Sequence, residues 1–175
     1  NVFMQYNKTK EGTYELLKAP NVDTGLGLER VIGLLQGKSN VYETELFADV
    51  IAKIEELAKN PNISSSRIIA DHLRASMFMI VDGVRPSNVE QGYVLRRLIR
   101  RAMRHLRSLG VSSDAITELA QVVINDYKEF YPDLELNKDS ILNRLKKEEN
   151  AFSKALQQGI KEYQKLINNI DNNLI

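Results

Sequence analysis

The stretch that most restricts the fold of this chain is a run of arginines at residues 94–107. Its apolar residues recur at i, i+1, i+4 and i+5, the spacing that lines one face of an α-helix. These residues are Val94, Leu95, Leu98, Ile99, Ala102, Met103 and Leu106. The rest of the circumference is taken by Arg96, Arg97, Arg100, Arg101, Arg104 and Arg107. The pattern predicts a helix that packs on one side and meets negative charge on the other.

A basic helix face can be a phosphate-binding surface or simply a solvated one. A solvated face usually carries glutamate four residues from a basic side chain, and no acid lies between Arg96 and Arg107. We therefore favour contact with phosphates, which makes nucleic acid the expected class of partner. Because the net charge is only +1, such binding depends on how the charge is distributed along the chain.

A second candidate site is the segment Val22-Asp-Thr-Gly-Leu-Gly-Leu-Glu-Arg30, which has the pattern of a strand end, a glycine turn and a helix start. Glycines at a helix N-terminus let backbone N–H groups approach an anion, and Arg30 would reach the same anion. Asp23 could bind an ammonium group or merely cap the turn. Two glycines are a weak pattern, so an ordinary strand–turn–helix corner explains the spacing equally well.

The remaining periodicity predicts a short hairpin followed by helices. The hairpin strands are expected at 2–6 and 13–17, ended by Pro20-Asn21. The first helix is expected to end at Gly37, the second to span 44–59, and the third to run from a cap at Ser64–Ser66 to Val81. The next three are expected from 92 to Gly110, from a cap at Ser113 to Phe130, and from Lys138 onward. The helix before Val81 is apolar nearly all round and should be central. The last helix keeps a coiled-coil-like period.

The composition excludes several kinds of site. The chain has no cysteine, so it has no disulfide and no thiolate metal site, which fits a cytoplasmic protein. Its two histidines lack a second ligand at metal spacing, so we expect no metal site, with His72 in the core and His105 on the basic face. No apolar run reaches the roughly 18 residues of a membrane span, and we expect no membrane partner.

Five segments resemble, in the same order, sequences of the alanyl-tRNA synthetases, a family of class II aminoacyl-tRNA synthetases. Val22–Arg30 is similar to motif 3 of that class, and the strand at 2–7 is similar to the one before it. Ala70-Asp-His-Leu-Arg74, Asp82-Gly-Val-Arg-Pro-Ser-Asn88 and Gly92–His105 are similar to the start of the tRNA-recognition domain. The resemblance covers at least residues 1–110 and continues more loosely to the end of the chain.

The resemblance implies a mainly α fold with two domains. Residues 1–37 would be the end of the class II catalytic domain and would form a small antiparallel β remnant of its sheet. Residues 38–175 would form a helical tRNA-recognition bundle. The implied function is part of alanine–tRNA ligation, which activates alanine with ATP and Mg²⁺ and transfers it to alanine tRNA. The implied partner is the acceptor stem of that tRNA. Zinc would be expected only in an editing domain, which this sequence lacks.

The resemblance also implies roles for individual residues. The ATP contacts would be Arg30, at the γ-phosphate, and Gly27. The amino-acid contacts would be Val2, Gly25 and Asp23, with Asp23 holding the amino group of alanine. Asn88 would read the G·U wobble pair of the acceptor stem. The residues near the RNA backbone would be Arg96, Arg97, Arg100, Arg101 and Arg104.

Parts of the family's pattern are missing from this sequence. It lacks motifs 1 and 2, the Trp-Asn pair before Asn1, and an acid beyond the last helix. We therefore expect an excised piece of a longer polypeptide with no complete catalytic site, inactive alone because it lacks the motif-2 arginine that would stabilise the α-phosphate. One alternative is a stand-alone RNA-binding module without catalytic activity. Another is a helical interaction domain whose last helix pairs with a partner.

Overall fold

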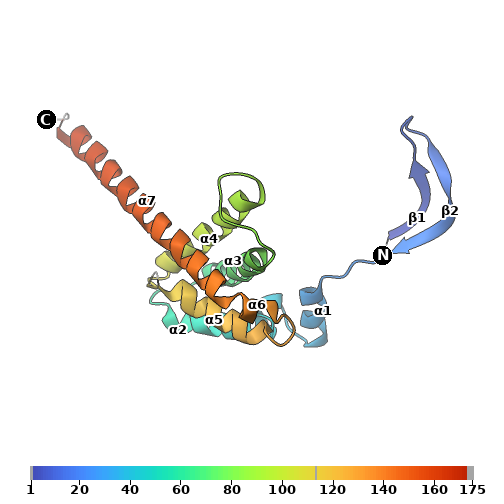
Figure 1. The fold of residues 1–175 in the computed structure, drawn as a ribbon, viewed down its shortest axis with the longest axis horizontal. Coiled ribbons are helices and arrows are strands. Elements are labelled where there is room, and N and C mark those ends of the chain that lie inside the picture. The colour runs from blue at the N-terminus through green and yellow to red at the C-terminus, as the bar shows by residue number, and fades with distance from the viewer. Residues whose placement is uncertain (1, 113, 173–175) are drawn as a thin grey trace. The chain divides into compact units, whose positions relative to one another are not determined.

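The computed structural model describes residues 2–112 and 114–172 (Figure 1). The described chain is mainly α-helical, with one antiparallel hairpin at its N-terminus, so the predicted fold class is confirmed. The chain forms two compact units, Asn1–Thr44 and Glu45–Ile175. The first unit extends beyond residue 37, where we expected the catalytic remnant to end. The functional identity of the two domains stays a prediction.

The hairpin consists of strand β1 (Val2–Lys8) and strand β2 (Tyr14–Asp23). Both strands are longer than predicted, and β2 continues through Pro20 to pair Asp23 with Val2. The register shifts between Met4 and Tyr6, where β2 carries extra residues opposite β1. Such a bulge leaves backbone groups outside the hydrogen-bond ladder, and a proline, which has no N–H, is tolerated there. The expectation that Pro20 ends the hairpin was therefore wrong.

The rest of the first unit is helix α1 (Leu28–Leu35) and the short 3-10 helix η1 (Val41–Glu43). Gly37 follows α1 with φ +64, a backbone conformation that glycine adopts without steric cost. The predicted end of this helix at Gly37 is confirmed. Asn40 begins η1, where its side-chain oxygen accepts a hydrogen bond from the Tyr42 N–H at 3.0 Å.

The second unit is a helical bundle built around helix α3 (Figure 1). Its elements are α2 (Ala48–Leu57), α3 (Ile63–Val81), α4 (Glu90–Ser108), α5 (Ala115–Tyr127), α6 (Asp133–Leu136) and α7 (Lys138–Asn172). Helix α3 packs against all five others, with Ile69, Leu73 and Met77 fully buried. The prediction that this helix is central is confirmed.

Several local expectations were wrong. Asn62 caps α3 in place of the serines, because its side-chain oxygen accepts from the Ser65 N–H at 2.9 Å. Helix α5 ends at Tyr127, which leaves Phe130 outside the helix and 80% exposed. Val94 lies at the edge of the α4 stripe and is 50% exposed. The predicted cap at Ser113 lies outside the described residues.

Among residues 138–168 of helix α7, the buried side chains lie in its first half. Ile141 and Leu145 are fully buried, whereas Tyr163 and Leu166 are largely exposed. The apolar period that we read as coiled-coil-like thus continues onto a part of α7 that projects from the bundle (Figure 1). Pairing of this part with a partner stays a prediction.

Candidate nucleic-acid interface

Five of the six arginines of α4 divide into two sets, and the first set has an acidic partner. Glu148 on α7 is buried, with its side chain 8% exposed. One of its oxygens accepts a hydrogen bond from Arg100 Nε at 2.6 Å and lies 3.4 Å from Arg96 Nε. The counter-charge of these two residues thus comes from a distant part of the sequence. Their predicted RNA contacts stay predictions.

The second set, Arg97, Arg101 and Arg104, is exposed along a groove bounded by α3, α4 and α7. The groove has a volume of about 580 Å³. Its lining is His72, Tyr93, Val94, Arg97, Leu98, Arg100, Arg101, Arg104 and Phe152, which includes no carboxylate. Positive charge concentrated in a groove attracts a polyanion, and the apolar and aromatic side chains beside it can contact sugars or bases.

The two aromatic rings of this groove lie beside arginines. The Arg97 guanidinium is 5.7 Å from the centre of the Tyr93 ring, and the Arg100 guanidinium is 5.8 Å from that of Phe152. Such cation–π contacts orient the guanidinium groups without neutralising them. The charge of Arg97 is therefore retained for a ligand, whereas that of Arg100 is shared with Glu148.

The two histidines of the chain have different neighbours. His72 lines the groove, and its Nδ1 lies 2.9 Å from an Asp71 carboxylate oxygen. That hydrogen bond is the main cause that lowers the pKa of Asp71, with smaller contributions from the positive charges of Arg74 and Arg101. His72 is thus satisfied by a neighbour, as predicted, although it lies at the groove surface.

His105 does not belong to the basic face, contrary to our expectation. Its Nδ1 lies 3.0 Å from Ser65 Oγ, between α4 and α3. Burial lowers the pKa of His105, and the nearby charges of Arg104, Arg101 and His72 lower it further. A lowered pKa keeps the imidazole neutral at pH 7, so His105 adds no charge to the interface.

The loop between α3 and α4 is held by side chains on two helices. Arg144 on α7 donates to the Val84 carbonyl at 3.0 Å. Arg96 on α4 donates to the side-chain oxygen of Asn88 and lies 3.5 Å from the Pro86 carbonyl. Asn88 itself is exposed, so its side chain is both fixed and accessible.

A second basic groove of about 480 Å³ lies beside this loop. It is lined by Arg85, Pro86, Arg96, Arg144, Lys147, Glu148 and Ala151. The sequence analysis did not single out Arg144 and Lys147, because it used only the apolar residues of the last helix. Their spacing of three residues, which places two cations on one helix face, was the signal that could have found them.

In the first unit, the structure brings two of the predicted amino-acid contacts together. Val2 and Asp23 are directly opposed partners at the open end of the hairpin, and both are exposed. The linker that follows is extended, and a Cβ added at Gly25 would have no atom within 4 Å. The predicted roles of Val2, Asp23 and Gly25 stay predictions.

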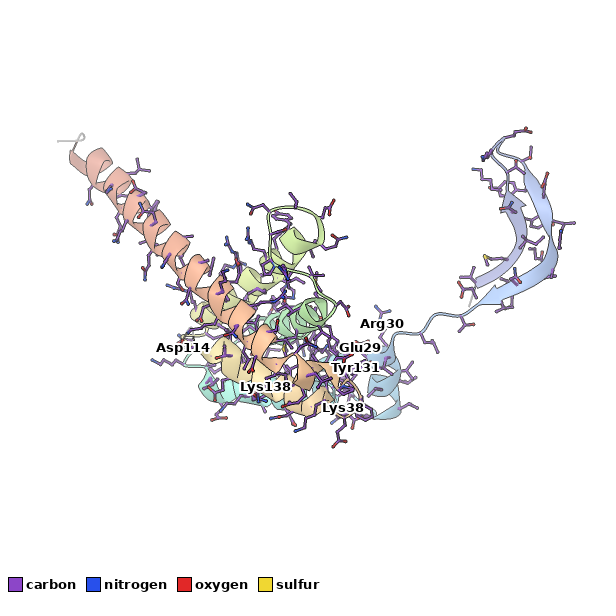
Figure 2. The ribbon with its side chains drawn as sticks, in the orientation of Figure 1. Glu29, Arg30, Lys38, Asp114, Tyr131 and Lys138 are labelled. Carbon is purple, nitrogen blue, oxygen red and sulfur yellow. The ribbon has the colours of Figure 1, made fainter. Side chains whose placement is uncertain are left out.

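The predicted ATP contacts lie at the start of α1. Gly27 is the N-cap of the helix and has no side chain that could cap the first turn. Arg30 is exposed on that first turn (Figure 2). Backbone N–H groups at a helix N-terminus, beside a guanidinium, form a suitable surface for a phosphate. The roles of Arg30 and Gly27 stay predictions.

Residues 2–112 and 114–172 contain neither a cluster of metal ligands nor a membrane-spanning helix. Within these ranges, no group of three or more histidine, cysteine, aspartate or glutamate side chains could hold a metal ion. Within the same part of the chain, no helix combines the length and apolarity needed to cross a membrane.

The helical unit thus carries two basic grooves and a polar loop that is held by Arg96 and Arg144. The chain belongs to the class II (A) tRNA synthetases, whose family model matches residues 1–174. Its curated relatives include the alanine–tRNA ligases of Borrelia hermsii (strain HS1 / DAH), Treponema pallidum (strain Nichols) and Legionella pneumophila (strain Paris), which are 46%, 44% and 44% identical to it. The alignments cover 100%, 95% and 97% of this chain but only 31%, 29% and 20% of the relatives' own length. The resemblance that we inferred from the motifs is confirmed.

Proposed function

We propose that this chain is the part of an alanine–tRNA ligase that binds the acceptor stem of alanine tRNA. The observation that carries the proposal is the groove along α4, where Arg97, Arg101 and Arg104 are exposed and no carboxylate is among the lining residues. An A-form RNA duplex presents closely spaced phosphates beside a wide, shallow minor groove. A row of exposed arginines matches the phosphates and supplies affinity without selecting a sequence.

Selectivity would come from the loop that precedes α4. The exposed Asn88 amide is held by Arg96, so it can reach a base edge in the minor groove at a defined position. We assign to it the reading of the G·U wobble pair. The cations of the second groove, Arg85, Arg144 and Lys147, would hold the phosphates next to that base pair.

We further propose that the first unit contributes to ATP and alanine binding in the intact enzyme. Arg30 and the N-terminus of α1 at Gly27 would contact the ATP phosphates. Asp23, opposite Val2, would hold the amino group of alanine, and Gly25 would leave room for the substrate. Mg²⁺ would neutralise phosphate charge during alanine activation. Because the motif-2 arginine is absent, we expect no ATP–pyrophosphate exchange from the 175-residue chain alone.

The test of RNA binding is the salt dependence of affinity for an acceptor-stem hairpin, followed by fluorescence anisotropy. Each phosphate contact contributes about 0.7–0.9 to the slope of log K against log salt concentration. Replacing Arg97, Arg101 and Arg104 with alanine should lower that slope by about 2–3. The matched control replaces Lys10, Lys18 and Lys128, which are exposed cations outside both grooves. An unchanged slope in the arginine variant, or an equal loss in the control, would overturn the proposal.

A further inference from the structure

The imidazole ring of His72 on α3 has one nitrogen that is hydrogen-bonded and one that is not. Its Nδ1 lies 2.9 Å from a carboxylate oxygen of Asp71. The lowered pKa of Asp71 keeps that carboxylate ionised at pH 7, and a carboxylate can only accept, so Nδ1 carries a hydrogen. Within the part of the chain that the structure describes, Nε2 has no hydrogen-bond partner and is not buried. In the neutral ring, Nε2 is therefore an unused acceptor.

His72 is one of the residues that line the groove along α4. Its side chain is 12% exposed, so most of the ring is enclosed by neighbouring side chains. The other lining residues are arginines, aromatic residues and two aliphatic residues, without a carboxylate. A phosphate group that enters the groove thus meets the imidazole among guanidinium groups.

The charged groups around His72 oppose one another. On α3, the carboxylate of Asp71 favours a protonated ring, and the nearby Arg74 disfavours it. The groups on α4 that disfavour it are Arg97, Arg100, Arg101 and Arg104, which line the same groove, and His105, whose pKa is lowered in part by the charge of His72. From α7, the groove lining contains only Phe152, while Glu148 is engaged by Arg100. An anion in the groove would offset the repulsion from the arginines.

We propose that His72 is a further phosphate ligand of this groove and takes up a proton when a polyanion binds. The inference rests on the proposed binding of RNA. A proton that moves from solvent to Nε2 converts this atom from an acceptor into a donor and gives the ring a positive charge. The ring then makes a charge-assisted hydrogen bond to a phosphate oxygen, whereas the lone pair of the neutral ring repels that oxygen. Asp71 is a positioning residue, because it holds Nδ1 and leaves Nε2 for the ligand.

Proton uptake makes the affinity for RNA depend on pH. If binding takes up one proton, log K falls by up to about one for each pH unit. Histidine changes charge between about pH 5 and 8, whereas the arginines of the groove stay charged throughout this range. We therefore expect RNA to bind about 3- to 10-fold more tightly at pH 6 than at pH 8.

The first experiment measures the affinity for an acceptor-stem hairpin by fluorescence anisotropy at pH 6 and pH 8, at one salt concentration. His72→Gln keeps a hydrogen-bond donor but cannot be charged, so its affinity should be the same at both pH values. The matched control is His105→Gln, at the other histidine of the chain, whose lowered pKa keeps it neutral. This variant should keep the pH dependence of the wild type. An undiminished pH dependence in His72→Gln, or its loss in His105→Gln alone, would overturn the inference.

Calorimetry counts the protons directly. The enthalpy of RNA binding, measured at pH 7 in two buffers of different ionisation enthalpy, gives the number of protons taken up. Wild type should take up more than His72→Gln, by up to about one proton for each RNA bound. Asp71→Asn removes the carboxylate that stabilises the charged ring, so its uptake should lie below that of the wild type. Equal uptake by wild type and His72→Gln would contradict the assignment.

The outcomes also separate proton uptake from RNA binding itself. If the wild type shows no salt-dependent affinity for the hairpin, the proposed function fails and the role of His72 fails with it. If the wild type binds with a steep salt dependence but with equal affinity at pH 6 and pH 8, RNA binding stands and only the role of His72 is overturned.

Discussion

Asp126 on α5 should make the stability of the helical unit depend on pH between about 4 and 6. Burial raises the pKa of Asp126 from its usual value of 3.8 to about 6, and the negative charge of Asp49 on α2 adds to the rise. A raised pKa means that the folded state binds the proton more tightly than the unfolded state. The stabilising contribution is therefore complete below pH 4 and is lost as the pH rises through 6.

The size of the effect follows from the shift. A pKa change of about 2, at about 1.36 kcal/mol per pKa unit, limits the effect on the free energy of unfolding to about 3 kcal/mol. Solvent reaches part of Asp126 and screens its charge, so we expect about 1–2 kcal/mol. Asp126→Asn removes the charge and should raise the free energy of unfolding by that amount at pH 7, with almost no difference at pH 4.

The assay is urea unfolding followed by circular dichroism from pH 4 to 8, with the difference between variant and wild type plotted against pH. The matched control is Asp49→Asn, which removes the neighbouring charge but not the burial of Asp126. Its effect should be the smaller one, because burial is the larger cause of the shift. A difference that is constant with pH, or an equal effect of both variants, would refute the reasoning.

Three further predictions concern the packing of the helical unit, and each is measured as the free energy of unfolding in urea. Tyr127→Phe should lower the free energy of unfolding by about 1–3 kcal/mol. The reason is that the hydroxyl donates to the Leu46 carbonyl at 2.9 Å and accepts from Arg74 at 2.8 Å. An unchanged free energy of unfolding would show that water replaces both hydrogen bonds. Leu73→Ala should lower the free energy of unfolding by about 2–5 kcal/mol, since Leu73 is fully buried on the central helix. Leu136→Ala, at an exposed residue, should lower it much less. Asn62→Ala should cost about 1 kcal/mol through loss of the α3 cap, and Ser64→Ala should cost little if Asn62 is the cap.

Much of the fold was predictable because it depends on local spacing. The apolar period placed the helices, and the glycine at residue 37 marked the end of α1, since both signals lie within a few neighbouring residues. The caps were less predictable. Asn62 and the serines at 64–66 are all good N-cap residues, and only the observed hydrogen bond to the Ser65 N–H decides between them.

The candidate site was less predictable because its key contacts join distant residues. Nothing near Arg96 or Arg100 in the sequence indicates Glu148 as their partner. In the sequence of α7, however, Glu148 interrupts the row of apolar residues. A carboxylate within an apolar stripe is a usable signal, because a buried charge needs a partner. For His105, the signal was its position three residues after Ala102, on the packed side of α4.

The arginine run of α4 therefore serves two different purposes along one helix. Two arginines share one buried carboxylate, so the charge of Glu148 is satisfied while a net positive charge remains between α4 and α7. One of these two also fixes the amide of Asn88. Arg97, Arg101 and Arg104 remain exposed. Substitutions in this second set should change the salt dependence of RNA binding, whereas substitution of Arg96 should change the preference between base pairs. A variant series along α4 that showed one common effect at every arginine would contradict this division.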